Sequence, residues 1–475
     1  MSRKEVSWFP GGMLLSALLL LAACAHIDTT RPAVELPAMT EPAEPKAEHF
    51  WTLFGDEQLT LLVEEALANN RDLKVAVARI EEARANLQIA RMTLYPTLDA
   101  AAGANRSKLS GAIDLPLPPG TPLVSNTFNV GLAASYEVDL WGKLAAGREA
   151  ASASLLATRY AAETVRIALA AQVATTYFTL RGLDAELVVT RDTLVTRDEN
   201  VRIQRTRSNA GLINELDLRF AEADRSTVAA TIPPLERAVA QTEAALARLV
   251  GRGAKGVFTP EVARGRPLDE TVVAPEVPSG LPSDLLARRP DVRQAEAILL
   301  ASRAQTAEVH AQYFPSLVLT GSVGQESMDL SDLFSAPARV WSIAGSLLQP
   351  IVGLKRIGAE VDAATARSEQ AALFYQQSVV DALRDVHDAL VEHSAARASF
   401  EAQDDRRRKQ ADVLRLAELR YRNGYSSYLE VLDAQRNLFD ADRARVVALR
   451  DQQTAVIDLY RALGGGWSPE QFAAQ

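Results

Sequence analysis

Residues 70–96 open with Asn70-Arg71-Asp72-Leu73 and close with Leu94-Tyr95-Pro96, and the second half of the chain repeats this stretch from Arg289-Pro290-Asp291-Val292 to Tyr313-Phe314-Pro315. The aspartates and the final prolines of the two stretches are both separated by 219 residues. Self-similarity at a fixed spacing is typical of a chain built from copies of one structural unit. The sequence therefore predicts two tandem repeats.

Both copies carry the same order of predicted elements: a short helix, two alternating segments, a very long helix, a glycine turn and a return helix. Gly211 matches Gly424, and Gly251 matches Gly464, each 213 residues apart, so one loop differs in length between the copies. Prolines are expected to mark where helices do not run. The proline-free tracts 143–208 and 354–422 are rich in strong helix formers and predict helices roughly 100 Å long at 1.5 Å per residue.

The return helix of the second copy carries a heptad pattern, with apolar residues on two companion positions and Gln453 as a polar exception. The apolar residues are Leu432, Phe439, Val446 and Tyr460, and then Leu449, Val456 and Leu463. This pattern predicts a coiled-coil seam. The short helix and the return helix together nearly match the long helix in length, so they could stack end to end beside it.

Four segments alternate with a period of two residues, which is typical of strands. They cover residues 97–107 and 127–139 in the first copy and 316–326 and 340–349 in the second. Each is about as long as a tilted strand that crosses a bilayer. Two soluble hairpins that cap a helical rod are the alternative interpretation. Spanning strands must close into a barrel, and four cannot do so. Two chains would give a filled eight-stranded barrel, and three chains an open lumen.

The amino terminus resembles a bacterial lipoprotein export signal. A basic start and an apolar run from Met13 to Ala22 precede Leu21-Ala22-Ala23-Cys24, and Cys24 is the only cysteine of 475 residues. The run is too short to span a bilayer. The resemblance implies cleavage before Cys24 and lipidation of its thiol, with palmitate among the acyl chains, and Ala25 is compatible with delivery to the outer membrane. An ordinary signal peptide with a chance cysteine is the alternative.

These features predict the domain organisation. The segments are a signal peptide (1–23), a lipidated tether (24–50), repeat 1 (51–251, hairpin tip about 208–214), a linker (252–282), repeat 2 (283–466, hairpin tip about 421–427) and a tail (467–475).

Composition and motifs exclude several functional classes. A net charge of -9 does not fit a nucleic-acid surface, and the scattered histidines give no metal site or cofactor. The GxGxxG pattern from Gly251 to Gly256 follows a helix instead of a strand, so it does not predict a dinucleotide site. No catalytic constellation has a recognisable spacing, and we expect no enzyme.

In its doubled order of elements and its two turn motifs, the chain resembles the outer-membrane factors, the efflux ducts of the TolC/OprM/NodT type, in their lipoprotein branch. The resemblance implies a homotrimer, in which a twelve-stranded barrel in outer-membrane lipid continues as a twelve-helix tunnel through the periplasm. It also implies a passive duct for drugs or other small molecules, which works with a periplasmic membrane-fusion adaptor and an inner-membrane pump, probably of the RND type. A periplasmic coiled-coil adaptor or structural lipoprotein without a pore is the alternative.

The turns between long helices and return helices carry the candidate site. Asn and Gly suit left-handed backbone at a helix end, so these segments are at least turns. The resemblance implies that they contact the adaptor, and the tip residues are Asn209, Gly211, Leu212, Asn423, Gly424 and Tyr425.

Three carboxylates follow the turns: Asp217, Glu430 and Asp433. Three chains around one axis would make each inward carboxylate a ring that favours cations. The resemblance implies gate and selectivity-ring roles for them and a gate role for Tyr421. Ser426 stands where the best-known member has an arginine, so other contacts must help to hold this gate. Solvated helix acids remain the alternative.

Overall fold

The computed structural model describes residues 30–33, 49–110, 122–270 and 288–465. The chain divides into two compact units. One contains the β-sheet and the helical segments next to it, residues 81–157 and 296–374 with the short segment before Ala33. The other contains the remaining parts of the helices, including both hairpin tips.

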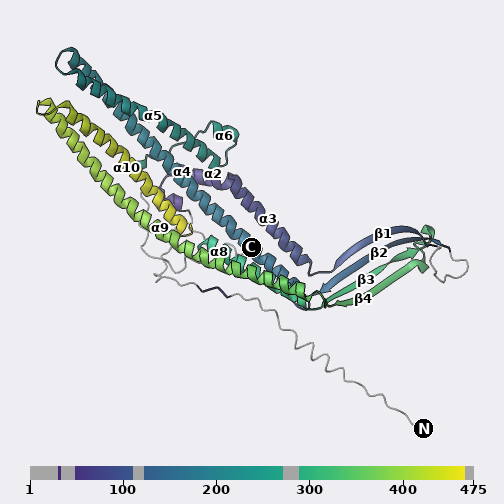
Figure 1. Ribbon diagram of the computed structural model, residues 1–475. Helices are drawn as coiled ribbons and strands as arrows, with labels where there is room; N and C mark the ends of the chain where they lie inside the picture. The colour runs from purple at the N-terminus through teal and green to yellow at the C-terminus, as the bar shows by residue number, and fades with distance from the viewer. Residues whose placement is uncertain (1–29, 34–48, 111–121, 271–287, 466–475) are drawn as a thin grey trace, which may run out of the picture. The chain divides into compact units, whose positions relative to one another are not determined.

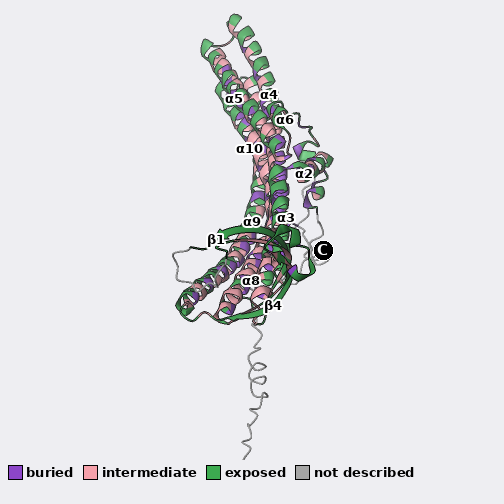
Figure 2. Cartoon of the chain, turned by 90° about the vertical axis from the view of Figure 1, so that its right-hand side faces the viewer, coloured by how far each residue is buried: buried purple, intermediate pink, exposed green. Residues whose placement is uncertain are grey.

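The sheet is antiparallel and has the order β1-β2-β3-β4 (Figure 1). Its strands are β1 (Thr97–Lys108), β2 (Val124–Val138), β3 (Ser316–Ser327) and β4 (Arg339–Leu348). Each lies within three residues of the range expected from the alternation. β2 and β3 are neighbours, so the two copies of the repeat meet in the middle of the sheet, and β1 and β4 form its edges. All residues of β1 and of β4 are exposed in this single chain (Figure 2).

Strand register sorts the side chains onto two chemically different faces. Ala100, Leu132, Val323 and Trp341 lie in register across the four strands, and the rows next along carry Leu98 and Ile343 on one side. The opposite face carries the row Asp99, Ala133, Ser322 and Ser342. Directly paired residues point to the same side of a sheet. One whole face is therefore apolar and the other polar, as the alternation predicts.

The long helices are α4 (Lys143–Asn209) and α9 (Leu354–Arg422), and the return helices are α5 (Glu215–Leu249) and α10 (Tyr428–Ala462). The short helices are α3 (Arg71–Met92) and α8 (Pro290–His310). The predicted bounds of the long helices are confirmed to within one residue. Among the described helices, none combines the length and hydropathy required to cross a bilayer.

One expectation about proline is wrong. α5 continues through Pro233 and Pro234, although prolines were expected to mark the ends of helices. Both prolines are exposed, and so is Ala230, whose carbonyl loses its N–H partner at Pro234. Water can satisfy a carbonyl at an exposed face, so the helix is interrupted in its hydrogen bonding without ending.

The short and return helices meet end to end, as predicted, and do so in the same way in both copies. The side-chain amide of Asn70 donates to the Leu249 carbonyl at 2.8 Å, and the equivalent Arg289 donates to the Ala462 carbonyl at 3.1 Å. A Cβ added to Gly251 would lie 2.5 Å from the Asn69 carbonyl oxygen. The glycine therefore permits close approach of the two helix ends.

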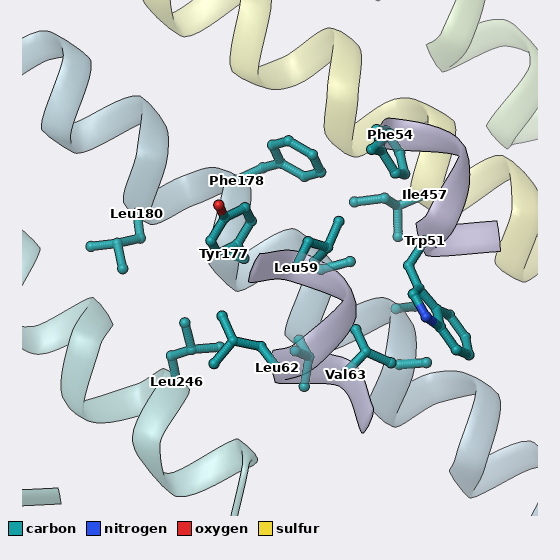
Figure 3. Close-up of a cluster of buried hydrophobic side chains, with 14 of the residues drawn as sticks. Trp51, Phe54, Leu59, Leu62, Val63, Tyr177, Phe178, Leu180, Leu246 and Ile457 are labelled. Carbon is teal, nitrogen blue, oxygen red and sulfur yellow. The ribbon is translucent and has the colours of Figure 1, made fainter. Parts of the chain in front are cut away.

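A buried aromatic cluster at this junction was not predicted. The 3-10 helix η1 (Phe50–Phe54) and helix α2 (Glu57–Asn69) pack against α4, α5 and α10, and Figure 3 shows Phe54, Leu59, Phe178 and Ile457 converging there. Asp56 caps α2 and accepts a 2.6 Å bond from the Tyr177 hydroxyl. Burial, and next the Asp56 bond, raise the Tyr177 pKa above its ordinary value. The phenol thus stays protonated as a donor.

The predicted seam of α10 lies in the core. Leu432, Val446, Leu449 and Val456 are buried, and Gln453 is buried with them. Along the linker, α6 (Ala254–Phe258) follows the turn at Gly251, and the segment before that turn is α5. The GxGxxG pattern thus lacks the preceding strand that a dinucleotide site requires.

Candidate functional site at the hairpin tips

Both long helices end in the same hydrogen-bonded turn. The amide of Gly211 donates to the Ser208 carbonyl and that of Leu212 to the Arg207 carbonyl, each at 2.9 Å. In the second copy, Gly424 and Tyr425 repeat this pair of bonds at 3.0 and 2.9 Å. This is the Schellman arrangement, which requires left-handed backbone at the glycine, and φ is 67° at Gly211 and 75° at Gly424. Both turns reverse the chain into a return helix (Figure 1).

The predicted tip residues project from these turns. Leu212 is 74% exposed and Tyr425 is 78% exposed. Asn209 and Asn423 are also exposed, and the Asn423 side-chain amide donates to the Leu419 carbonyl at 2.7 Å. Two large apolar side chains thus stand in equivalent positions on the two tips, free of intrachain packing.

The predicted carboxylates occupy the start of each return helix. Asp217 and Glu430 are equivalent, in the first turns of α5 and α10, where the helix dipole favours negative charge. Asp217 is half-buried and has no ion pair within the described part of the chain, whereas Glu430 lies 3.4 Å from Arg420. Asp433 is exposed and accepts a 3.1 Å bond from Asn437. The structure therefore separates one uncompensated acid from two that have local partners.

Tyr421 joins the two hairpins. Arg207 at the end of α4 donates to the Tyr421 hydroxyl on α9 at 3.2 Å, and its guanidinium carbon lies 5.6 Å from the ring centre. The Tyr421 ring also packs 5.6 Å from Tyr428. Ser426 is half-buried, and its hydroxyl has no partner among the described residues. Arg207 and Arg420 therefore supply the cationic contacts near the tips where Ser426 supplies none.

A buried ion-pair layer beneath the tips was not predicted. Asp224 on α5 lies 2.7 Å from Arg197 on α4 and 2.7 Å from Arg436 on α10. Arg197 also donates to the Gln435 carbonyl at 3.0 Å. Burial lowers the Arg197 pKa, while the neighbouring Asp224 raises it. Three helices are thus fastened through one carboxylate.

A sequence signal for this layer exists. Arg197 and Asp224 are nearly equidistant from the glycine of the turn, as are Asp198 and Arg225, which pair at 2.8 Å. Residues at equal distances from a hairpin turn face each other, so opposite charges at such positions predict ion pairs across the hairpin.

The predicted lipidation site, Cys24, lies outside the described residues. The segment that follows it is held against the sheet-bearing unit: Arg31 pairs with Glu296 on α8 at 2.6 Å, and Arg303 donates to the Thr30 carbonyl at 2.5 Å. Within the residues that the structure describes, no cluster of histidine, cysteine and carboxylate could hold a metal ion.

Comparison with known proteins identifies the family. The outer membrane efflux protein family matches residues 62–252 and again residues 281–465, one match for each repeat. The chain belongs to the outer membrane efflux protein family. The solvent efflux pump outer membrane protein SrpC of Pseudomonas putida is 34% identical over 471 residues, which cover 96% of this chain and 98% of SrpC. The cation efflux system protein CusC of Escherichia coli is 31% identical and covers 95% of this chain and 97% of its own.

Solved structures agree. The outer-membrane channel CmeC of Campylobacter jejuni superposes with a TM-score of 0.83 at 26% identity, covering 92% of this chain and 95% of CmeC. This chain is therefore an outer-membrane efflux channel protein that extends into the periplasm, in a family of ducts. The alternative of an adaptor without a pore is not supported.

Proposed function

We propose that three copies of this efflux protein close into one duct. The sheet geometry carries the proposal: four strands with one apolar and one polar face end at two exposed edges. In hydrocarbon, each unpaired edge group costs several kcal/mol, about the size of any unsatisfied buried polar group. Three sheets joined edge to edge turn the apolar faces to lipid and the polar faces to a lumen.

The duct is passive and is loaded by partners in the periplasm. The exposed Leu212 and Tyr425 suit apolar contact with the hairpins of a membrane-fusion adaptor, and an inner-membrane pump, of the RND type, supplies the energy. Relatives of similar identity are named for solvents and for cations, which supports a duct whose cargo is chosen upstream. We propose no catalytic activity and no cofactor.

The lipid on Cys24 anchors the chain to the outer membrane, with palmitate among its acyl chains. Six residues separate Cys24 from Thr30, and an extended chain covers at most about 3.3–3.6 Å per residue. The contacts of Thr30 and Arg31 with α8 therefore keep the lipid close to the sheet-bearing unit.

The hairpin tips form the gate. Asp217 and Tyr421 lie where the two hairpins of one chain meet, and Glu430 and Asp433 add carboxylates on α10. Rings of three such acids attract cations and repel anions at a constriction. Opening requires the Arg207–Tyr421 contact to break, because it fastens α4 to α9.

Single-channel conductance in planar bilayers tests this function. The purified protein should form small cation-selective channels, and Asp217→Asn combined with Tyr421→Phe should raise their conductance severalfold by loosening the tips. Asp440→Asn, an exposed acid further along α10, is the matched control and should leave conductance unchanged. A protein that inserts and never conducts would end the proposal, and an unchanged double variant would remove Asp217 and Tyr421 from the gate.

A further inference from the structure

The two copies of the repeat already meet once inside the chain, at the contact between β2 and β3. There Ser135 faces Thr320 and Val138 faces Leu317 in the ladder. Just below the strands, the Trp141 ring stacks on Phe314 at 4.8 Å and its N–H donates to the Pro315 carbonyl at 2.8 Å. This internal seam joins the last strand of copy 1 to the first strand of copy 2.

Sequence equivalence transfers this seam to the exposed edges. The first strands are related by the offset of 219 residues that links Pro96 to Pro315. Around the second strands, Ser135 matches Ser346, Gly142 matches Gly353 and Gly147 matches Gly358, each 211 residues apart. In an edge-to-edge ring, β4 of one chain meets β1 of the next, which is again a last strand against a first strand.

We propose that this second seam, between two copies of the chain, repeats the internal one residue for residue. Ser346 of one copy then faces Ala101 of the next, and Ser342 faces Asn105. Val352, the equivalent of Trp141, packs on Tyr95 and Pro96 of the next copy. The proposal rests on the proposed trimer and adds its contact residues.

Three features of the single chain support this register. It places Leu347 opposite Ala100 and Ile343 opposite Ala104, so the apolar face continues across the seam without a break. Val352 is 96% exposed and Tyr95 is 62% exposed in one chain, as expected of side chains that a second copy covers. Ile351 is the equivalent of Leu140, which stays exposed beside the internal seam, so Ile351 should stay exposed in the trimer.

One competing register is defined by the structure itself. The hairpins of the two copies differ by two residues: Thr97 faces Ser135, whereas the equivalent Ser316 faces Leu348 instead of Ser346. If this slip carried into the seam between chains, Ala344 would face Asn105. The lower contacts favour the unslipped register, because Gly142 and Gly353 fix the equivalence of Trp141 and Val352.

Paired cysteines test the register in the full-length protein. The double variants Ser346→Cys/Ala101→Cys and Ser342→Cys/Asn105→Cys should give a covalent trimer under mild oxidation, seen on non-reducing gels. Exchanging partners (Ser346→Cys/Asn105→Cys and Ser342→Cys/Ala101→Cys) uses the same four substitutions and should give little crosslinking. A disulfide within one chain is excluded, because two strands separate β1 from β4 and a disulfide needs Cα atoms within about 7 Å.

A second readout needs no cysteine. Val352→Asp should lower the temperature at which the trimer dissociates in detergent by ten degrees or more, whereas Ile351→Asp, a neighbouring exposed residue, should not. Efficient crosslinking of Ala344→Cys/Asn105→Cys, or of the exchanged pairs, in a conducting trimer would overturn the register while leaving the duct intact. A monomer that conducts nothing and crosslinks in no pairing would instead overturn the proposed function and the register together.

Discussion

At the scale of single residues, Asp224 is the side chain on which most of the tip depends. It is 2% exposed and lies between Arg197 and Arg436, each 2.7 Å away. A buried ion pair is a weak source of net stability, but removing one partner leaves the other charge buried and uncompensated. The layer therefore fixes which helices meet more than how strongly they bind.

Asp224→Ala should destabilise the helical unit by about 3–5 kcal/mol, because Arg197 keeps its burial and loses its partner. Thermal unfolding in detergent, followed by circular dichroism, measures the loss. Asp198→Ala is the control: its pair with Arg225 is solvent-exposed, so removing it should cost about 0–1 kcal/mol. Equal effects of the two variants would contradict the assignment of Asp224 as the buried fastener.

Tyr428 makes the tip sensitive to alkaline pH. Burial, and next the charge of Asp224, raise the pKa of Tyr428 from 10.0 to about 12. A raised pKa means that its contribution to stability is complete below pH 10 and is lost as the pH rises through about 12. The ultraviolet absorbance of tyrosinate should show a late-titrating tyrosine that Tyr428→Phe removes. If that variant titrates as the parent does, the Tyr428 phenol is not held neutral by its surroundings.

At the scale of elements, the two tip turns depend on backbone conformation and not on space. A Cβ added to Gly211 or Gly424 would meet nothing within 4 Å, yet both residues have positive φ. The α10 return helix and its partner α5 begin only a few residues after these turns. Their first-turn acids therefore keep a fixed position only while the turns keep their shape.

Gly211→Ala and Gly424→Ala should each lower stability by about 1–2 kcal/mol, the cost of left-handed backbone for an ordinary residue. Gly253→Ala is a matched control, because its Cβ also meets nothing and its φ is -70°. It should leave the melting temperature unchanged. A Gly253 variant as unstable as the two tip variants would show that the cost does not come from φ.

The elements that the sequence could predict are the periodic ones. α4 and α9 were predicted to within one residue because long proline-free tracts leave few alternatives, and the strands because period-two alternation matches a two-faced sheet. α2 and η1 were missed because they are short and make sense only against Tyr177 and Phe178, more than a hundred positions away. The Asp56 cap was readable. The Arg207–Tyr421 contact was not, since it joins separate hairpins.

At the scale of the whole molecule, the duplication explains why one chain is incomplete. Copy 1 and copy 2 share a seam at β2 and β3, and each has one further edge that can form the same kind of seam only with another chain. The matched junctions at Asn70 and Arg289 show how closely the copies follow one plan. A closed ring satisfies every edge, and a ring with an open lumen requires more than two copies.

Native mass spectrometry of the purified lipoprotein, released from detergent under gentle conditions, tests the central claim most directly. The account predicts a complex of three copies, with each mature chain carrying acyl mass at its amino-terminal cysteine. A folded monomer or a stable dimer as the main species, from a preparation that inserts into bilayers, would contradict it.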